Sequence, residues 1–434
     1  MKRFWRVSRW VVAMAAAVIL AVCVWQFIPR QSAWQAPADA ASLSDGSPAF
    51  MQELAVMTRS RVETGDAVEP IPAGADFQSA LLSAINSASS SIMMTDFPWD
   101  GGDFTHSVFL ALTAAAERGV TVRVLLDGFG GRTVPEEWID GLRQAGGKVS
   151  WYHTFNILDP LQYDVRDHAR SFVFDGRLAF TGGIGFVDYW VKNADGYDTW
   201  RDLMFAIRGN MADSLESDFA KLWKSATGEV LDTRLSGATT PRAATASSSD
   251  GVDYISIFGK PSLDFQPDRY AFLMTALGAR KKLYIESAYI VPDSDLIQIL
   301  EDKARAGVDV RIISPGPVTS APILRSAWHT YFSGLLSAGV KLYEYQPTMI
   351  HSKIMVADDL WSLVGSANVD DRSESINVES VLGISDAALA KSLDDIFMND
   401  VAQSKQIELR DWQNQYGFFD KLQSDFWLLF KRQE

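Results

Sequence analysis

The sequence predicts an α/β protein made of two copies of one domain, preceded by a single membrane-spanning helix. Three observations lead to this fold class. Continuous apolar strands alternate with amphipathic helices, three motifs occur twice in the same order, and the chain begins with an apolar segment. In each copy we expect a mixed, mostly parallel sheet flanked by helices. With 434 residues, of which 47% are hydrophobic and 22% charged, the chain is long enough for two such domains.

The chain begins with a segment, residues 1–29, that is predicted to be a membrane anchor or a signal segment. Residues 1–9 contain basic side chains and no acidic one, and Trp10 to Ile28 is nearly continuous apolar sequence, long enough to span a bilayer. The basic flank predicts a cytoplasmic N-terminus, with everything after the segment on the extracytoplasmic side. A cleaved signal peptide is the alternative, because the small residues at 36–40 resemble a cleavage site. The apolar segment is longer than a usual signal core, which favours the anchor.

A tether and then the first domain are expected to follow. Residues 30–66 are rich in Ala, Ser, Pro and Gln, so we expect a tether there and the first domain over residues 67–231. Apolar residues at helical spacing indicate helices, and continuous apolar runs indicate buried strands of a sheet covered on both faces. The expected helices are 76–90, 108–120 and 138–147, and the expected strands are 91–99, 121–127 and 148–153.

The second domain is expected over residues 252–434, after a linker at residues 232–251. The linker is a Ser/Thr/Ala/Gly stretch with no periodicity. The chain ends in FFDKLQSDFWLLFKRQE, residues 418–434, which is apolar on one side of a helix. Two interpretations stay open for this helix: it docks on its own domain, or it contacts a membrane interface.

The second half of the chain repeats the first. Three segments of the first half match three segments of the second half in the same order, and a repeat of this length indicates a duplicated domain rather than a solenoid. Paired copies would bring the last matching segments, which both begin with histidine, to one cleft. The matches are 115–127 with 303–315, 142–153 with 335–346, and 168–183 with 351–366.

The last match carries the residues with chemical potential. In an extended strand His351 and Lys353 point to one face, and the turn Gly365–Asn368 offers small hydrogen-bond donors close by. An imidazole, an ammonium and such a turn suit an oxyanion, and phosphate fits best. One copy alone could be a buried strand with an incidental histidine. The second copy, which begins at His168, favours the phosphate site.

His-x-Lys-x-x-x-x-Asp followed by Gly-Ser-x-Asn, present in two copies, resembles the phospholipase D superfamily. More narrowly, WRDLMFAIRG, ESAYIVPDSDL, MIHSK and VGSANVDDRSESINVES make the chain similar to bacterial cardiolipin synthases. The resemblance covers Val68 to Trp412 and implies two phospholipase D-like domains. It also implies a phosphatidyltransferase that joins two phosphatidylglycerols into cardiolipin and releases glycerol through a phosphohistidine.

The resemblance implies roles for individual residues. His168 would be the nucleophile and His351 the acid/base, although the residues alone do not decide which is which. Asp175 and Asp358 are expected in turns at the strand ends, where they help to order the site. Glu379 supports a histidine from behind or is a solvated strand-end acid. The expected catalytic residues are His168, Arg170, Asp175, His351, Lys353 and Asp358, and the expected substrate-binding residues are Gly183, Ser366, Asn368, Asn377 and Glu379.

Two positions of the first copy depart from the pattern. Arg170 stands where the family has lysine, and arginine grips phosphate in a different, fixed geometry. Gly182-Gly183 replaces Gly-Ser. The alternatives to the transferase are therefore a phospholipase D-type hydrolase, a catalytically degenerate lipid-binding protein and, last, a nuclease.

Composition narrows the partners. The formal net charge of −14 argues against a nucleic-acid partner, and the anchor favours a phospholipid substrate in a membrane, with phosphatidylglycerol expected. The five histidines form no HExxH pair and the only cysteine is Cys23, so neither a metal nor another cofactor is expected. The expected location is the bacterial inner membrane, with the catalytic domains on the extracytoplasmic side.

Overall fold

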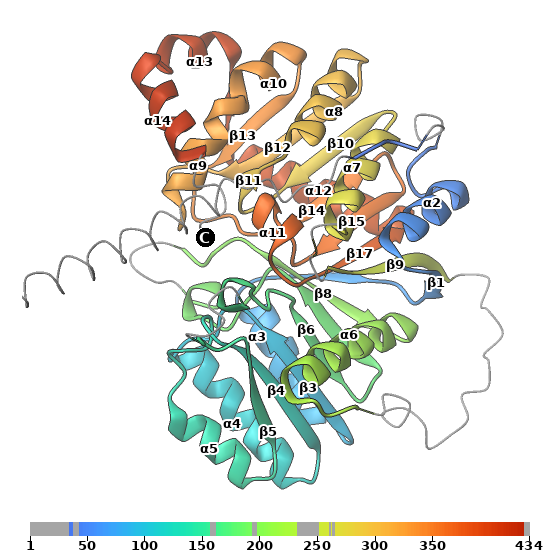
Figure 1. Ribbon diagram of the computed structural model, residues 1–434, viewed down its shortest axis with the longest axis vertical. Coiled ribbons are helices and arrows are strands. Elements are labelled where there is room, and N and C mark those ends of the chain that lie inside the picture. The colour runs from blue at the N-terminus through green and yellow to red at the C-terminus, as the bar shows by residue number, and fades with distance from the viewer. Residues whose placement is uncertain are drawn as a thin grey trace, which may run out of the picture.

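The computed structural model describes residues 34–37, 43–156, 162–192, 198–231, 251–259, 262 and 265–428. They form two α/β units that lie side by side, each built around one large sheet (Figure 1). No helix of these residues is long and apolar enough to cross a membrane. The expected anchor at residues 10–28 and nearly all of the expected linker lie outside the described residues.

The first unit is a seven-stranded sheet between two helical layers. Apolar side chains alternate between the two sheet faces, so that each face has its own core. Helices α3 (Ala75–Ser87), α4 (Asp103–Glu117) and α5 (Glu136–Gln144) cover one face, and α6 (Asn210–Thr227) covers the other. The strand order is β2 (Glu69–Pro72), β8 (Leu203–Arg208), β7 (Leu178–Gly182), β6 (Ser171–Phe174), β3 (Ser91–Asp96), β4 (Thr121–Asp127) and β5 (Lys148–Tyr152).

The second unit repeats this strand order within a nine-stranded sheet, which confirms the duplication. Its helices α7 (Pro267–Gly278), α8 (Ser294–Arg305) and α10 (Phe332–Ala338) pack on one face, and α12 (Ala387–Ala402) packs on the other. Two extra strands sit at the edges. The order is β1 (Val62–Gly65), β9 (Val252–Gly259), β17 (Glu379–Ser385), β15 (Trp361–Gly365), β14 (Ile354–Ala357), β10 (Lys282–Glu286), β12 (Asp309–Pro315), β13 (Lys341–Tyr345) and β18 (Ser404–Ile407).

The expectation of mostly parallel sheets is wrong. In the two large sheets only β3–β4–β5 and β10–β12–β13 pair in parallel, and the other neighbours are antiparallel. Parallel pairing needs a crossover connection, and only within these two groups does a helix join strands that are neighbours in the sheet. The motif strands β6 and β7, like β14 and β15, are joined by short turns and form hairpins. Because these hairpins are buried on both faces, their continuous apolar sequences look like those of parallel strands.

The expected tether also contains folded elements. Residues 48–58 form helix α2 (Pro48–Thr58), and residues 62–65 form β1, which pairs with β9 of the second unit. Phe50, Met51 and Leu54 are buried in the core of that unit. Ser47 accepts a hydrogen bond from the backbone N–H of Phe50 and caps the helix. The Ala- and Ser-rich composition of residues 30–66 did not indicate this short helix. Because α2 and β1 pack on the second unit and β2 belongs to the first, the chain crosses from the second unit to the first.

A shared core joins the two units. Helix α6 of the first unit also contacts β1 and β9 of the second. One hydrophobic cluster contains Leu215 and Trp223 of α6 together with Ile354, Leu382 and Leu389 of the second unit. The interface between the two copies is therefore packed like a domain interior, and it fixes the motif strands of both copies relative to each other.

Candidate active site

The two motif histidines lie at the interface between the units, just before strands β6 and β14. Each one is bound through its backbone to the opposite unit. The N–H of His168 donates to the carbonyl oxygen of Val378 at 3.0 Å, and the N–H of His351 donates to that of Arg201 at 2.7 Å. The short parallel bridges at these points place the two motifs in related positions. The duplication therefore brings both motif histidines into the same interface, as the sequence predicts.

Each imidazole is held by a carboxylate from the other copy. His168 Nδ1 lies 2.8 and 2.9 Å from the two carboxylate oxygens of Glu379, and His351 Nδ1 lies 2.8 Å from Oδ2 of Asp202. A carboxylate accepts a hydrogen bond from Nδ1–H and so fixes the tautomer in which Nε2 carries the lone pair. All four side chains are buried. The arrangement presents two Nε2 atoms that can act as nucleophile or base.

Asp202 was not among the residues expected at the site. It occupies the same place in the first copy that Glu379 occupies in the second, next to the first residue of β8 as Glu379 is at the start of β17. The signal was present in the repeat, because WRDL and NVES occupy corresponding positions. The expectation that Glu379 supports a histidine from behind agrees with the geometry, and Asp202 is its counterpart.

Two cations lie against the histidines. Arg170 Nη1 donates to Nε2 of His168 at 2.8 Å, and Lys353 Nζ lies 2.9 Å from Nδ1 and 3.3 Å from Nε2 of His351. Burial, followed by the charge of Arg170, lowers the pKa of His168 to about 4. Burial and the charge of Lys353 lower the pKa of His351 to about 3. Both imidazoles are therefore neutral near pH 7, as a nitrogen nucleophile requires, and the cations stand where an anionic phosphate would be attracted.

These depressed pKa values predict a loss of stability in mild acid. Below the ordinary pKa of 6.5 the unfolded chain binds protons on His168 and His351, while the native state does not until about pH 4. We expect each histidine to cost about 2 kcal/mol of unfolding free energy between pH 7 and pH 5. Buried acids such as Asp96, whose pKa burial raises to about 8, act in the opposite direction.

The test therefore compares the loss of unfolding free energy between pH 7 and pH 5 in two proteins. Urea unfolding followed by circular dichroism is compared at pH 7 and pH 5 for the natural chain and for a variant with both histidines changed to asparagine. The natural chain should lose more stability than the variant. The same pH dependence in both proteins would contradict the depressed pKa values.

Arg170 is fitted to its place on both sides. Its side chain is 1% exposed, its Nη1 also donates to the carbonyl of His168 at 2.9 Å, and its Nε lies 3.6 Å from Asp96 Oδ1. A lysine would keep the charge, but its single nitrogen cannot contact His168 and Asp96 from two different nitrogen atoms as the guanidinium does. We expect Arg170→Lys to lower kcat/KM about tenfold, which corresponds to about 1.4 kcal/mol, because the contact with Asp96 is lost. Steady-state kinetics checks this, and a rise in kcat/KM would show that arginine is a handicap.

The glycine pair of the first copy also has a structural reason. A Cβ atom on Gly183 would overlap with the carboxylate of Asp202. Its counterpart Ser366 instead donates its hydroxyl to Oε2 of Glu379 at 2.5 Å. The longer glutamate leaves space for a hydroxyl, whereas the shorter aspartate lies against the glycine. Gly183 and Ser366 therefore position the two carboxylates, and neither departure from the motif leaves the site incomplete.

Asn368 and Asn377 have unused hydrogen-bonding capacity. Both atoms of the Asn368 side-chain amide are buried and have no hydrogen-bond partner among the described residues, and the same holds for Oδ1 of Asn377. The backbone N–H of Asn368 donates to Ser373 Oγ at 3.1 Å, which fixes the residue. A buried amide without a partner is costly, so a ligand that accepts a hydrogen bond from Nδ2 of Asn368, or donates one to the two Oδ1 atoms, would stabilise these side chains.

The structure does not bring Asp175 and Asp358 to the histidines. Both lie in the hairpin turns at the other end of the motif strands, at φ 53° and 54°. The carboxylate of Asp175 accepts backbone hydrogen bonds from residues 89–91, and that of Asp358 from residues 280–282. Burial raises the pKa of Asp175, but these donors outweigh it and hold the value at about 2. The two acids fasten the motif hairpins to β3 and β10.

Aromatic side chains line the site. The ring of Phe97 lies 5.5 Å from that of His168, and the rings of Trp190, Trp200 and Tyr289 lie 5.1, 5.5 and 5.9 Å from that of His351. The two imidazoles are only 4–5% exposed. Such surroundings exclude most water and strengthen the electrostatic interactions inside the site.

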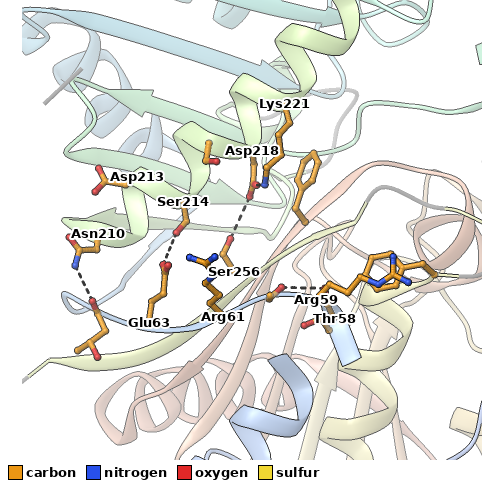
Figure 2. A pocket seen from close by; sticks show the side chains of 15 residues that line it. Thr58, Arg59, Arg61, Glu63, Asn210, Asp213, Ser214, Asp218, Lys221 and Ser256 are labelled. Atoms are coloured by element: carbon orange, nitrogen blue, oxygen red, sulfur yellow. Dashed lines mark hydrogen bonds and ion pairs between the residues drawn. The ribbon is translucent and has the colours of Figure 1, made fainter. Parts of the chain in front are cut away.

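One cavity has neither active-site histidine in its lining. This cavity of about 710 Å³ is lined by α2, β1, α6 and β9 (Figure 2). Cations and carboxylates neutralise each other there, for example in the 2.7 Å pair of Lys221 with Asp218. Within the described ranges no group of three or more His, Cys, Asp or Glu side chains is arranged to hold a metal ion.

Comparison with known proteins gives a family for both units. A family model described as "Cardiolipin synthase, PLD-like domain" matches residues 81–223 and 273–401. Cardiolipin synthase A of Pectobacterium carotovorum subsp. carotovorum (strain PC1) is 32% identical over 339 residues, which cover 77% of this chain and 69% of that protein. Cardiolipin synthase of Clostridium perfringens (strain SM101 / Type A) is 29% identical over 330 residues, 76% of this chain and 69% of that protein.

A solved structure shares the fold. Phosphatidylserine synthase of Haemophilus influenzae Rd KW20 aligns with a TM-score of 0.68 at 15% identity, and the alignment covers 88% of this chain and 99% of that one. At this identity the likeness concerns the arrangement of the two units. It agrees with the paired sheets.

Proposed function

The chain belongs to the family of phospholipase D-like cardiolipin synthases, and on that premise we propose that it joins two phosphatidylglycerols into cardiolipin and releases glycerol. Family membership makes it a phospholipase D-type phosphatidyltransferase. The observation that carries the specific proposal is the crossed pairing of two buried histidines with Glu379 and Asp202. Two such imidazoles, one on each side of a phosphorus atom, can divide nucleophilic attack and proton transfer between them.

In the first step Nε2 of His168 attacks the phosphorus atom of one phosphatidylglycerol. The phosphorus–oxygen bond to the headgroup glycerol breaks, and the departing alkoxide receives a proton from Nε2 of His351, which takes up this proton from solvent when the anionic phosphate binds beside it. Attack leaves a positive charge on the His168 ring, and Glu379 stabilises this charge. Arg170 and Lys353 turn from the imidazoles to the nonbridging phosphate oxygens. The phosphate anion beside the ring and the departure of Lys353 both raise the pKa of His351, so that it binds a proton before the bond breaks.

In the second step a glycerol hydroxyl of another phosphatidylglycerol attacks the same phosphorus atom. His351 accepts the hydroxyl proton, the phosphorus–nitrogen bond breaks, and His168 returns to its neutral form. The products are cardiolipin and one glycerol, so atoms and charges balance over the two steps. The apolar walls around both rings favour a lipid alcohol over water as the acceptor.

Product analysis tests this proposal. Purified full-length protein is reconstituted in phosphatidylglycerol vesicles, and cardiolipin, phosphatidic acid and free glycerol are quantified over time. We expect cardiolipin and glycerol in equal amounts. Phosphatidic acid as the main product would replace the proposal with a hydrolase, and absence of turnover with bound lipid would indicate a lipid-binding protein. A variant with His351 changed to asparagine gives the background.

We also propose that residues 10–28 anchor the enzyme in the bacterial inner membrane, with both catalytic units on the extracytoplasmic side. The length of this apolar sequence and the basic residues before it support the proposal. Alkaline phosphatase is active only outside the cytoplasm, so a fusion of this reporter after residue 434 is expected to be active. An inactive fusion that is expressed at a normal level would contradict this orientation.

A further inference from the structure

Helix α14 (Phe418–Leu428) is amphipathic, but its apolar side is exposed and its polar side is turned toward its own domain. Phe418, Phe419 and Leu422 are 74%, 80% and 57% exposed, whereas Ser424 is 2% exposed. The Ser424 hydroxyl lies 3.3 Å from that of Ser326. A helix that packs on its own protein turns its apolar side inward. Here the apolar side is presented outward.

The inner side of α14 is correspondingly polar. Asp420, Gln423 and Ser424 face a cavity of about 360 Å³, which is also lined by His329 and Tyr416. In Figure 1 the helix lies at the outer edge of the second unit, beside α9 (Pro322–Trp328) and α13 (Leu409–Gln415). Polar contacts on the inner side therefore hold the helix in the orientation that exposes its phenylalanines.

The C-terminal end of α14 packs close to the active site. The last residues of α14, Trp427 and Leu428, pack with Tyr289 against a small core formed by β11 (Ile290–Val291) and α9. The ring of Tyr289 lies 5.9 Å from the ring of His351. The C-terminal end of α14 and a residue in the wall of the catalytic site therefore pack against the same small core.

We propose that α14 binds the surface of an anionic lipid bilayer through Phe418, Phe419 and Leu422, and holds the active site against the membrane that contains its substrate. This inference rests on the proposed function, in which the substrate is an anionic phospholipid. The sequence after Leu428 continues with two apolar and then two basic residues, Leu429-Phe430-Lys431-Arg432. Aromatic residues followed by cations are the composition that binds at the interface of an anionic membrane.

Lipid contact is tested first by fluorescence quenching. In full-length protein with Cys23 changed to serine, Leu422→Cys carries an environment-sensitive dye, and the protein is reconstituted in phosphatidylglycerol vesicles with nitroxide-labelled acyl chains. We expect a blue shift and quenching of the dye. The matched control is Leu110→Cys, because Leu110 is 59% exposed on α4 of the other unit. Its dye should show neither effect.

The second measurement is activity at the membrane. The variant Phe418→Ser/Phe419→Ser/Leu422→Ser should lose about 100-fold in kcat/KM on phosphatidylglycerol vesicles, because three apolar side chains no longer enter the bilayer. Its activity on dispersed short-chain phosphatidylglycerol should stay unchanged. Equal activity of the natural chain and the variant on vesicles, or an unquenched dye at position 422, would overturn the inference.

Two other outcomes are distinguishable from these. A dye that is protected but not quenched, in a chain that light scattering shows to be a dimer, would identify a second copy as the occupant and overturn the membrane inference. Absence of turnover on both substrates by the natural chain would refute the proposed function. Quenching at position 422 would still be measured in that case, so the two failures are separate.

Discussion

Replacing His168 or His351 by asparagine is expected to lower phosphatidyl transfer by about 10,000-fold or more, the usual effect of removing a catalytic nucleophile or its proton-transfer partner. Neither asparagine can attack phosphorus or exchange a proton near pH 7. Asparagine remains polar, so Glu379 or Asp202 keeps a hydrogen-bonding neighbour in the buried site. Initial rates of glycerol release give the activity, and circular dichroism shows whether each variant is folded.

The matched control is His106→Asn. His106 lies on α4 and stacks on Trp138 with ring centroids 4.5 Å apart, outside the interface between the units. Its replacement should leave the rate unchanged. Normal turnover by either active-site variant would contradict the two-histidine mechanism.

A good leaving group separates the roles of the two histidines. A phosphatidyl ester of p-nitrophenol needs no proton to release the phenolate. If His168 is the nucleophile, the His351→Asn variant should release p-nitrophenol once and keep the lipid covalently bound, since the second step needs a base. Mass spectrometry would find the phosphatidyl group on His168. The His168→Asn variant should show neither burst nor label, and the opposite pattern would exchange the two roles.

The sequence predicts the motif strands well because their chemistry is local. His351 and Lys353 belong to one short segment, and the repeat supplies the second segment at His168. The partner carboxylates are different. Asp202 and Glu379 act across the interface, and no periodicity along one strand indicates which copy a strand faces. The structure supplies this information through the crossed backbone contacts of Val378 and Arg201.

Other differences have the same origin. The parallel order of the sheets was overestimated because hairpins buried on both faces have no polar alternation. Asp175 and Asp358 lie in turns, as expected, but their predicted part in catalysis comes from the motif alone, and in the structure their carboxylates bind backbone N–H groups at the other end of the motif strands. Helix α2 was missed because its apolar side packs on the second unit, far away in sequence. In each case a long-range contact decides the role of a local pattern.

Removing the carboxylates is expected to have the second largest effect. Asp202→Asn and Glu379→Gln should each lower kcat by about 1,000-fold, since an amide can stabilise the wrong imidazole tautomer and cannot neutralise an imidazolium. The pKa of the facing histidine should fall further, because each carboxylate raises it. Asp309→Asn is the control: this carboxylate binds Arg311 and Lys341 on the far part of the sheet and should not affect turnover.

Double variants test the crossed pairing itself. If Glu379 acts only through His168, adding Glu379→Gln to His168→Asn should cost almost nothing more, and the same should hold for Asp202→Asn in the His351→Asn background. The pairing within each copy, His168 with Asp202, should behave differently, because each residue then serves a different imidazole. Such a variant should approach the background rate only through two separate losses. Coupling within copies instead of across them would contradict the geometry, because it would mean that each copy completes its own site and that the shared interface is not what assembles the catalytic pair.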